Sequence, residues 1–235
     1  MYLLFFLSGL LNSFAHQTLA DVNFIEYTHS APLDENHYAS RLDGFGLKLE
    51  HNGDNNGGAA ETSSLNHCKS LVYRTLKSLP ATTVNNLKNL TLTFNNDDRR
   101  GMGGGSTIIL RCSNMTDEEL VGVLVHEMGH VADTGVLQGN FYTGASEFKD
   151  GENAIYNDDR SLEFYRLSFL DSTTLRPNAI EVDFVSQYAM SDVFEDFAET
   201  YNYYILHGDE FREVAKMNKI LQKKYEFLKT RVFEG

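Results

Sequence analysis

The sequence predicts an α+β fold, in which a small N-terminal mixed sheet packs on a central helix and the C-terminal half is mostly helical. Strand-like segments rich in β-branched and apolar residues gather between residues 87 and 112. From residue 116 onward, apolar side chains recur instead at helical spacing. Strands that precede a run of helices favour α+β over the alternating pattern of a parallel α/β fold.

Composition indicates one globular domain with a core of its own. The chain has 235 residues, of which 42% are hydrophobic and 23% charged, within the usual range for folded domains. Its formal net charge is -13. Because an acidic surface repels phosphate backbones, we expect no nucleic-acid partner.

The N-terminus has the features of a secretory signal. Residues 2–11 are almost all apolar, in a run too short to span a bilayer but typical of a signal-peptide core. Thr18 and Ala20 provide small residues for cleavage before Asp21, although no Lys or Arg precedes the apolar run. We therefore expect a signal peptide over residues 1–20, a secreted or extracytoplasmic protein and no stable membrane insertion after cleavage. The alternative is a buried or uncleaved anchor helix.

Residues 21–60 are expected to be poorly structured, because residues 52–58 form a turn-rich run with little to bury. The main domain is expected over residues 61–235. Its two cysteines, Cys68 and Cys112, are too few for a cysteine-based zinc site. In an exported protein they would form a disulfide; otherwise they are two buried thiols.

The first elements of the domain follow from periodicity and breakers. A helix is expected from Ser63 or Ser64 to Leu79, where Pro80 ends it. One strand is expected over residues 87–94 and another over 107–112. The glycine-rich segment 101–106 between them lacks the Gly-Lys-Ser/Thr of a phosphate loop, so we expect a flexible hairpin connection or a mobile flap.

The best-marked helix begins after Thr116. This residue is a good N-cap, Glu119 completes a capping-box pattern, and the helix is expected to run to Ala132 with Gly135 as its terminator. Further helices are expected over residues 161–171, 192–207 and 209–232.

Within this helix, residues 126–130 read His-Glu-Met-Gly-His. Residues four apart share one helix face, so His126 and His130 can both reach one metal ion at about 2.0–2.1 Å. Glu127 is offset by one residue, which suits a general base that does not bind the metal. Gly129 costs roughly 1 kcal/mol inside a helix relative to Ala, which predicts that another chain segment approaches closely there.

A catalytic zinc site usually has a third protein ligand and an open position. Glu195 and Glu199 lie four apart on a predicted helix, and two aligned, partly buried carboxylates are costly unless paired. We assign Glu195 as the third ligand and Glu199 as acceptor of a hydrogen bond from the far nitrogen of a ligand histidine. Asp133 shares the face of His126, and we expect it to orient a ligand histidine or to cap the helix.

The pattern H-E-x-x-H followed by E-x-x-x-D/E resembles the gluzincin peptidases, and within them the family of anthrax lethal factor and the Pro-Pro endopeptidases. In that family a tyrosine precedes the ligand Glu by seven residues, as Tyr188 precedes Glu195 here. The resemblance covers residues 117–132 and 184–204. It implies a zincin-like domain over 61–235, one Zn²⁺ per chain, endopeptidase activity on a protein or peptide substrate, and a Tyr188 that stabilises the oxyanion.

The strand at 107–112 is expected to border the cleft and to pair with an extended substrate.

Three alternatives to a zinc endopeptidase stay open. They are a catalytically inactive zinc-binding secreted protein, a zinc amidase acting on cell-wall material, and an envelope structural protein whose histidine pair is coincidental.

Overall fold

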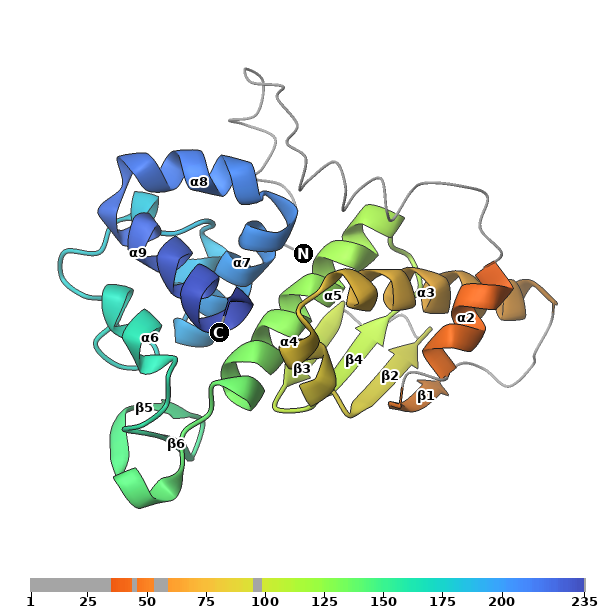
Figure 1. The fold of residues 1–235 in the computed structure, drawn as a ribbon, viewed down its shortest axis with the longest axis horizontal. Helices are drawn as coiled ribbons and strands as arrows, with labels where there is room; N and C mark the ends of the chain where they lie inside the picture. The colour runs from red at the N-terminus through yellow and green to blue at the C-terminus, as the bar shows by residue number, and fades with distance from the viewer. Residues whose placement is uncertain (1–34, 44–45, 53–58, 95–98, 235) are drawn as a thin grey trace.

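The computed structural model describes residues 35–43, 46–52, 59–94 and 99–234, and the chain has the predicted α+β architecture. One helix, α5 (Asp117–Val131), runs through the middle of the molecule (Figure 1). A sheet and its helices lie on one side of α5, and the helices of the C-terminal half lie on the other. The expected signal peptide at residues 1–20 lies outside the described residues.

The sheet is mixed and has four strands in the order β1-β2-β4-β3. The strands are β1 (Lys48–Asn52), β2 (Asn89–Thr93), β3 (Gly101–Gly104) and β4 (Thr107–Arg111). Strands β1, β2 and β4 run parallel, while β3 pairs antiparallel with β4. Alternate residues such as Leu90, Leu92 and Leu110 are fully buried, so one face of the sheet packs on the core.

Two expectations about this region are wrong. The glycine-rich segment is not a flexible connection, because residues 101–104 form strand β3 at the sheet edge. Strand β4 was expected to border the cleft and to pair with a substrate. It cannot pair with a further strand, because β2 and β3 already pair with it on its two sides. Within residues 21–60, where little structure was expected, the chain forms helix α2 (Glu35–Asp43) and strand β1.

Two helices precede and follow the break at Pro80. Helix α3 (Ala59–Ser78) begins earlier than predicted, and α4 (Ala81–Asn86) starts directly after the proline. Cys68 on α3 forms a disulfide with Cys112, the residue after β4. This resolves the choice between a disulfide and two buried thiols.

Helix α5 begins as predicted. The Thr116 hydroxyl accepts a hydrogen bond from the Glu119 backbone N–H at 3.2 Å, while the Glu119 carboxylate pairs with Arg100. The helix continues into a π-helix over Ala132–Val136, in which Thr134 Oγ1 donates to the carbonyl of His130. The expected terminator Gly135 therefore lies inside the π-helical turn.

The C-terminal half begins with a two-stranded hairpin and continues with helices. Its elements are β5 (Ala145–Asp150), β6 (Asn153–Tyr156), α6 (Leu162–Ser168), α7 (Val193–Leu206), α8 (Gly208–Met217), α9 (Lys219–Phe227) and a terminal π-helix, Leu228–Phe233. The single helix predicted over 209–232 is wrong. The chain breaks at Asn218, whose Oδ1 accepts from the N–H groups of Ile220 and Leu221 and so caps α9.

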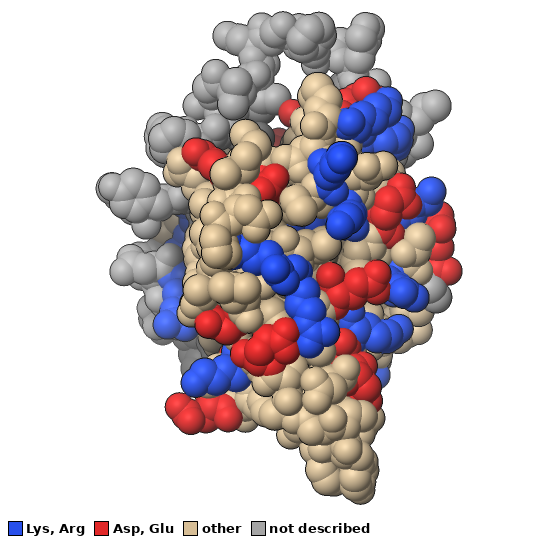
Figure 2. Space-filling model, turned by 90° about the vertical axis from the view of Figure 1, so that its left-hand side faces the viewer, with Lys and Arg blue, Asp and Glu red and all other residues tan. Residues whose placement is uncertain are grey.

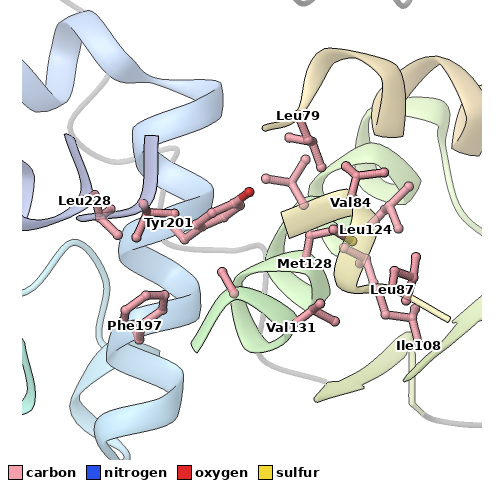
Figure 3. Packing of buried hydrophobic residues seen from close by; sticks show 14 of the residues in the cluster. Leu79, Val84, Leu87, Ile108, Leu124, Met128, Val131, Phe197, Tyr201 and Leu228 are labelled. Atoms are coloured by element: carbon pink, nitrogen blue, oxygen red, sulfur yellow. The ribbon is translucent and has the colours of Figure 1, made fainter. Parts of the chain in front are cut away.

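The two halves share one hydrophobic core across α5 (Figure 3). Leu124 and Met128 of α5 belong to the same buried cluster as Phe197 and Tyr201 of α7. Helices α5 and α7 meet at Gly129, where an added Cβ would lie 2.8 Å from Ala198 Cα. This confirms the close approach that the helical glycine predicted.

The face formed by the C-terminal half carries Lys and Arg interspersed with Asp and Glu (Figure 2). Exposed ion pairs such as Arg212–Asp209, Lys216–Glu213 and Arg231–Glu163 are found in this half. Mixed charge of this kind is typical of a solvated surface. Among the residues described, no helix has both the length and the apolarity that crossing a membrane requires.

Candidate metal centre

Three side chains that the sequence singled out converge between the two halves. His126, His130 and Glu195 each offer one ligand atom, and these atoms lie within 4.8 Å of one another. Nε2 of His126 is 3.1 Å, and Nε2 of His130 is 3.7 Å, from Oε2 of Glu195. The two histidines lie on α5 and Glu195 lies on α7. His130 and Glu195 are 65 positions apart in the sequence.

Local structure explains how each helix presents its ligands. On α5 the two histidines lie one turn apart, with their ring centroids separated by 4.9 Å. On α7, Asp192 caps the first turn by accepting from the N–H groups of Phe194 and Glu195, both at 2.9 Å. The cap places Glu195 in the first helical turn, where the contact of α5 with α7 brings it opposite the histidines.

The arrangement fits a metal ion. A tetrahedral site with bonds of about 2.0–2.1 Å separates neighbouring ligand atoms by roughly 3.4 Å, close to the separations of 3.1 and 3.7 Å. Oε2 of Glu195 is buried and has no hydrogen-bond partner, although Nε2 of His126 is near. The two atoms approach without hydrogen-bond geometry, as two ligands of one ion would.

Charge also favours a cation at this site. Glu127, Glu195 and Glu199 surround the two imidazoles, and no Lys or Arg in the described segments forms an ion pair with any of these carboxylates. Buried carboxylates need compensating charge. His126, His130 and Glu195 could therefore hold a divalent ion.

A chain of hydrogen bonds orients His126 from behind. Its Nδ1 lies 2.9 Å from Oε1 of Glu199, in the arrangement expected of a carboxylate that fixes a ligand histidine. The other oxygen of Glu199 accepts from the Ser186 hydroxyl at 2.6 Å, and Ser186 Oγ accepts in turn from the Ala189 N–H. Sequence reasoning assigned no role to Ser186, because a serine 13 residues from its partner carries no local signal.

The two histidines have opposite pKa shifts. Burial lowers the pKa of His126, but the neighbouring carboxylates of Glu195 and Glu199 outweigh it and raise the pKa to about 10. Burial and the neighbouring His126 lower the pKa of His130 to about 4. Without metal, His126 therefore carries the proton of the pair, and an ion binding to both nitrogens must displace it.

Glu127 lies on α5 beneath strand β3. Burial raises the pKa of its carboxyl to about 7, against the opposing effects of His126 and of a hydrogen bond from the Gly103 backbone. A Cβ atom on Gly101 or Gly103 would overlap the Glu127 side chain, and at Gly103 it would lie 2.6 Å from the Glu127 carbonyl oxygen. The glycines therefore let the strand backbone lie directly on this carboxylate.

Tyr188 begins a short 3-10 helix, Tyr188–Met190, beside the same group. Tyr188 is 38% exposed, its ring centroid is 6.2 Å from that of His126, and its hydroxyl is near enough to Glu195 for that carboxylate to shift its pKa. Burial and the charge of Glu195 raise the pKa of its hydroxyl above the usual range. It thus stays protonated and able to donate at neutral pH.

Asp133 lies elsewhere. It is buried, and both of its carboxylate oxygens accept from the Tyr165 hydroxyl at 2.7 Å, so it faces the core of the C-terminal half and not a ligand histidine. Burial raises the pKa of its carboxyl to about 8. The expectation that Asp133 orients a ligand histidine is therefore wrong, whereas Glu199 lies where the sequence placed it, beside Nδ1 of His126.

Comparison of the sequence with models of known protein families and with curated proteins finds no match. The interpretation of the site therefore depends on its own geometry and on the H-E-x-x-H pattern.

Proposed function

We propose that the chain is a zinc-dependent endopeptidase, with His126, His130 and Glu195 as ligands of one zinc ion and Glu127 as general base. The observation that carries this is the convergence of two imidazoles and one carboxylate oxygen within 4.8 Å. Two histidines, one glutamate and an open position form a common catalytic zinc set. Zinc bound there supplies Lewis acidity toward water and toward a peptide carbonyl.

The protein's own groups have separate tasks in this reaction. Glu127 accepts the proton of the attacking water and donates it to the leaving amine, a role that suits a carboxyl whose pKa of about 7 is near neutral pH. The protonated Tyr188 hydroxyl donates to the oxyanion that forms at the carbonyl. Glu199 holds His126 in the tautomer that directs Nε2 toward the ion.

An extended substrate would add to the sheet at β3. This strand is the edge nearest Glu127, since its glycines contact that side chain. Backbone pairing at a strand edge binds a peptide without requiring a particular side chain. The proposal therefore moves the substrate-binding strand from 107–112, as expected from sequence, to 101–104.

We further propose that the protein works outside the cytoplasm. The Cys68–Cys112 disulfide supports this, because structural disulfides persist mainly in oxidising compartments. The acidic net charge of -13 supports a protein or peptide substrate over nucleic acid.

Metal content by elemental mass spectrometry tests the ligand set. We expect about one zinc per chain in the wild type and its loss in His130→Ala and in Glu195→Ala. The matched control is Glu213→Ala, which removes an exposed carboxylate and should retain zinc. A wild-type protein that binds no zinc contradicts the proposal, and zinc retained by Glu195→Ala contradicts the third ligand.

Activity on a peptide library tests the reaction. Glu127→Gln should keep the zinc and lose roughly 10²–10⁴ of the turnover rate, the usual contribution of a general base. Turnover retained by this variant would exclude the mechanism. Zinc binding without cleavage by the wild type would instead favour an inactive zinc protein, or an amidase if cell-wall amides are hydrolysed.

A further inference from the structure

A buried lysine lies behind the metal centre, on the side of α7 away from the histidines. Lys224 of α9 is fully buried, and its ammonium nitrogen lies 2.8 and 2.7 Å from the two carboxylate oxygens of Asp196, which is buried as well. It also donates to the backbone carbonyl of Asp183 at 3.0 Å. Two of its hydrogens thus have hydrogen-bond acceptors, Oδ1 of Asp196 and the Asp183 carbonyl, while Oδ2 of Asp196 is an ion-pair contact.

Both segments that Lys224 contacts carry residues of the candidate site. Asp196 follows the ligand Glu195 on α7. Asp183 precedes the segment 184–190, which contains Ser186 and Tyr188. The ammonium nitrogen of Lys224 also lies 4.1 Å from the centroid of the Phe184 ring, a cation–π contact with the first residue of that segment.

Asn218 makes a second connection between α9 and the same segment. Its Nδ2 donates to the carbonyl of Val182 and to Oδ1 of Asp183, both at 2.9 Å. Its Oδ1 caps α9. One side chain therefore fixes the start of the helix and holds the chain just before the site residues.

We propose that Lys224 and Asn218 are positioning residues that hold Asp183, and with it the segment 184–190, against α7 and thereby place Tyr188 beside Glu195. A buried ion pair adds little net stability compared with apolar residues of similar volume, whereas it requires one particular geometry. Residues 184–187 belong to no helix or strand, so side-chain contacts must define their path. The effect on catalysis rests on the proposed function; the effect on the segment does not.

Two variants separate positioning from stability. The double variant Lys224→Met with Asp196→Asn removes both charges at nearly constant volume and leaves no uncompensated buried ion. Asn218→Asp keeps the oxygen that caps α9 but loses both donor hydrogen bonds from Nδ2. The matched control is Asn157→Asp, which removes an Nδ2 donor to the Thr143 carbonyl in the hairpin region.

Hydrogen exchange measured by mass spectrometry on peptides covering 184–190 is the first readout. Loss of one or two hydrogen bonds should raise exchange there roughly threefold to tenfold in both variants, with α5 unchanged and with the control like the wild type. Zinc content should stay near that of the wild type. The turnover rate should fall roughly tenfold to a hundredfold, as for other supporting groups, with little change in KM.

Unchanged exchange over 184–190 in both variants overturns the inference. A uniform rise that includes α5 also overturns it, because Lys224 would then be an ordinary stabilising core residue. Asn218→Asp decides the matter if the double variant does not fold. A wild type that neither binds zinc nor cleaves peptides defeats the proposed function, whereas the exchange result still decides the positioning role.

Discussion

Helix α7 carries two neighbouring carboxylates whose surroundings differ sharply. Asp196 is fully buried and contacts the ammonium group of Lys224. Glu195 points to the other side of the helix, keeps 19% of its side chain exposed and faces the imidazoles of two histidines. The first carboxylate is compensated by a lysine, while the second is compensated by protonated His126, which must lose its proton if an ion is to bind. In the proposed metal site, neighbouring acids on one helix would thus serve structure and ligand binding separately.

The largest expected effect comes from breaking the internal pair alone. Lys224→Met leaves the Asp196 carboxylate buried without its partner and should lower the free energy of unfolding by about 3–5 kcal/mol. Glu195→Gln removes a partly exposed group and should change it by only about 1 kcal/mol in metal-free protein. Urea unfolding with a chelator present measures both, and equal effects would show that the two carboxylates do not differ.

Added zinc should reverse the order of these two variants. A ligand at 1,000 times its Kd stabilises a folded protein by about 4.1 kcal/mol. We expect this gain in Lys224→Met, whose metal ligands are intact, and its loss in Glu195→Gln.

The next effect concerns the strand that lies on Glu127. Gly103→Ala must displace β3, because a Cβ there would lie 2.6 Å from the Glu127 carbonyl oxygen. A displacement on the order of 1 Å at a catalytic group can cost about 10² in rate, so kcat/KM should fall by that order while zinc is retained. Met102→Ala is the control, since Met102 is 48% exposed on the same strand. Equal losses in both variants would contradict a specific contact with Glu127.

A smaller effect is expected where α5 meets α7. Gly129→Ala should lower the free energy of unfolding by about 1–3 kcal/mol, because the new methyl group meets the backbone of Ala198. Gly122→Ala on the same helix meets nothing within 4 Å and should raise it by about 0.5–1 kcal/mol through helix propensity. The signs are opposite, so thermal or urea unfolding of the two variants checks the contact directly.

The smallest expected effect is a pH dependence of stability that comes from a third carboxylate, Asp133. Asp133 is partnered by the Tyr165 hydroxyl, and its folded pKa of about 8 lies above its value in the unfolded chain. The folded state therefore binds the extra proton between about pH 4 and pH 8, and the group's contribution to stability falls as pH rises through that range.

Asp133→Asn removes this titration. Relative to the wild type, the variant should gain about 1.4 kcal/mol in unfolding free energy from pH 6 to pH 7. Unfolding curves at the two pH values measure the difference, in which the histidine titrations common to both proteins cancel. Parallel behaviour of the two proteins would mean that Asp133 is ionised in the fold.

The sequence predicted what depends on neighbours along the chain. The Thr116 cap, the shared face of His126 and His130 and the close approach at Gly129 all follow from residues within one helix. The convergence of Glu195 with the histidines was inferred from a chemical need and a resemblance, because no local pattern shows that two helices meet. Nothing in the sequence marks Lys224 as buried, because its partner Asp196 lies 28 residues away.

Where prediction failed, a specific interaction outweighed periodicity. Apolar spacing continues across Asn218, yet its side chain caps a new helix. The glycines of β3 have low strand propensity, but pairing with β4 makes them a strand. Asp133 was placed on the histidine face by α-helical geometry, whereas the chain turns π-helical at Ala132 and rotates Asp133 away.

The composition of β3 also has a kinetic consequence. An edge strand of four residues, three of them glycine, offers few backbone groups and almost no side-chain surface to a chain that pairs with it. A product added there should dissociate quickly, since little binding energy is lost as it leaves. Because the edge offers few contacts, it also resists lasting self-association. In the proposed peptidase, the same short run of glycine would therefore favour both product release and solubility.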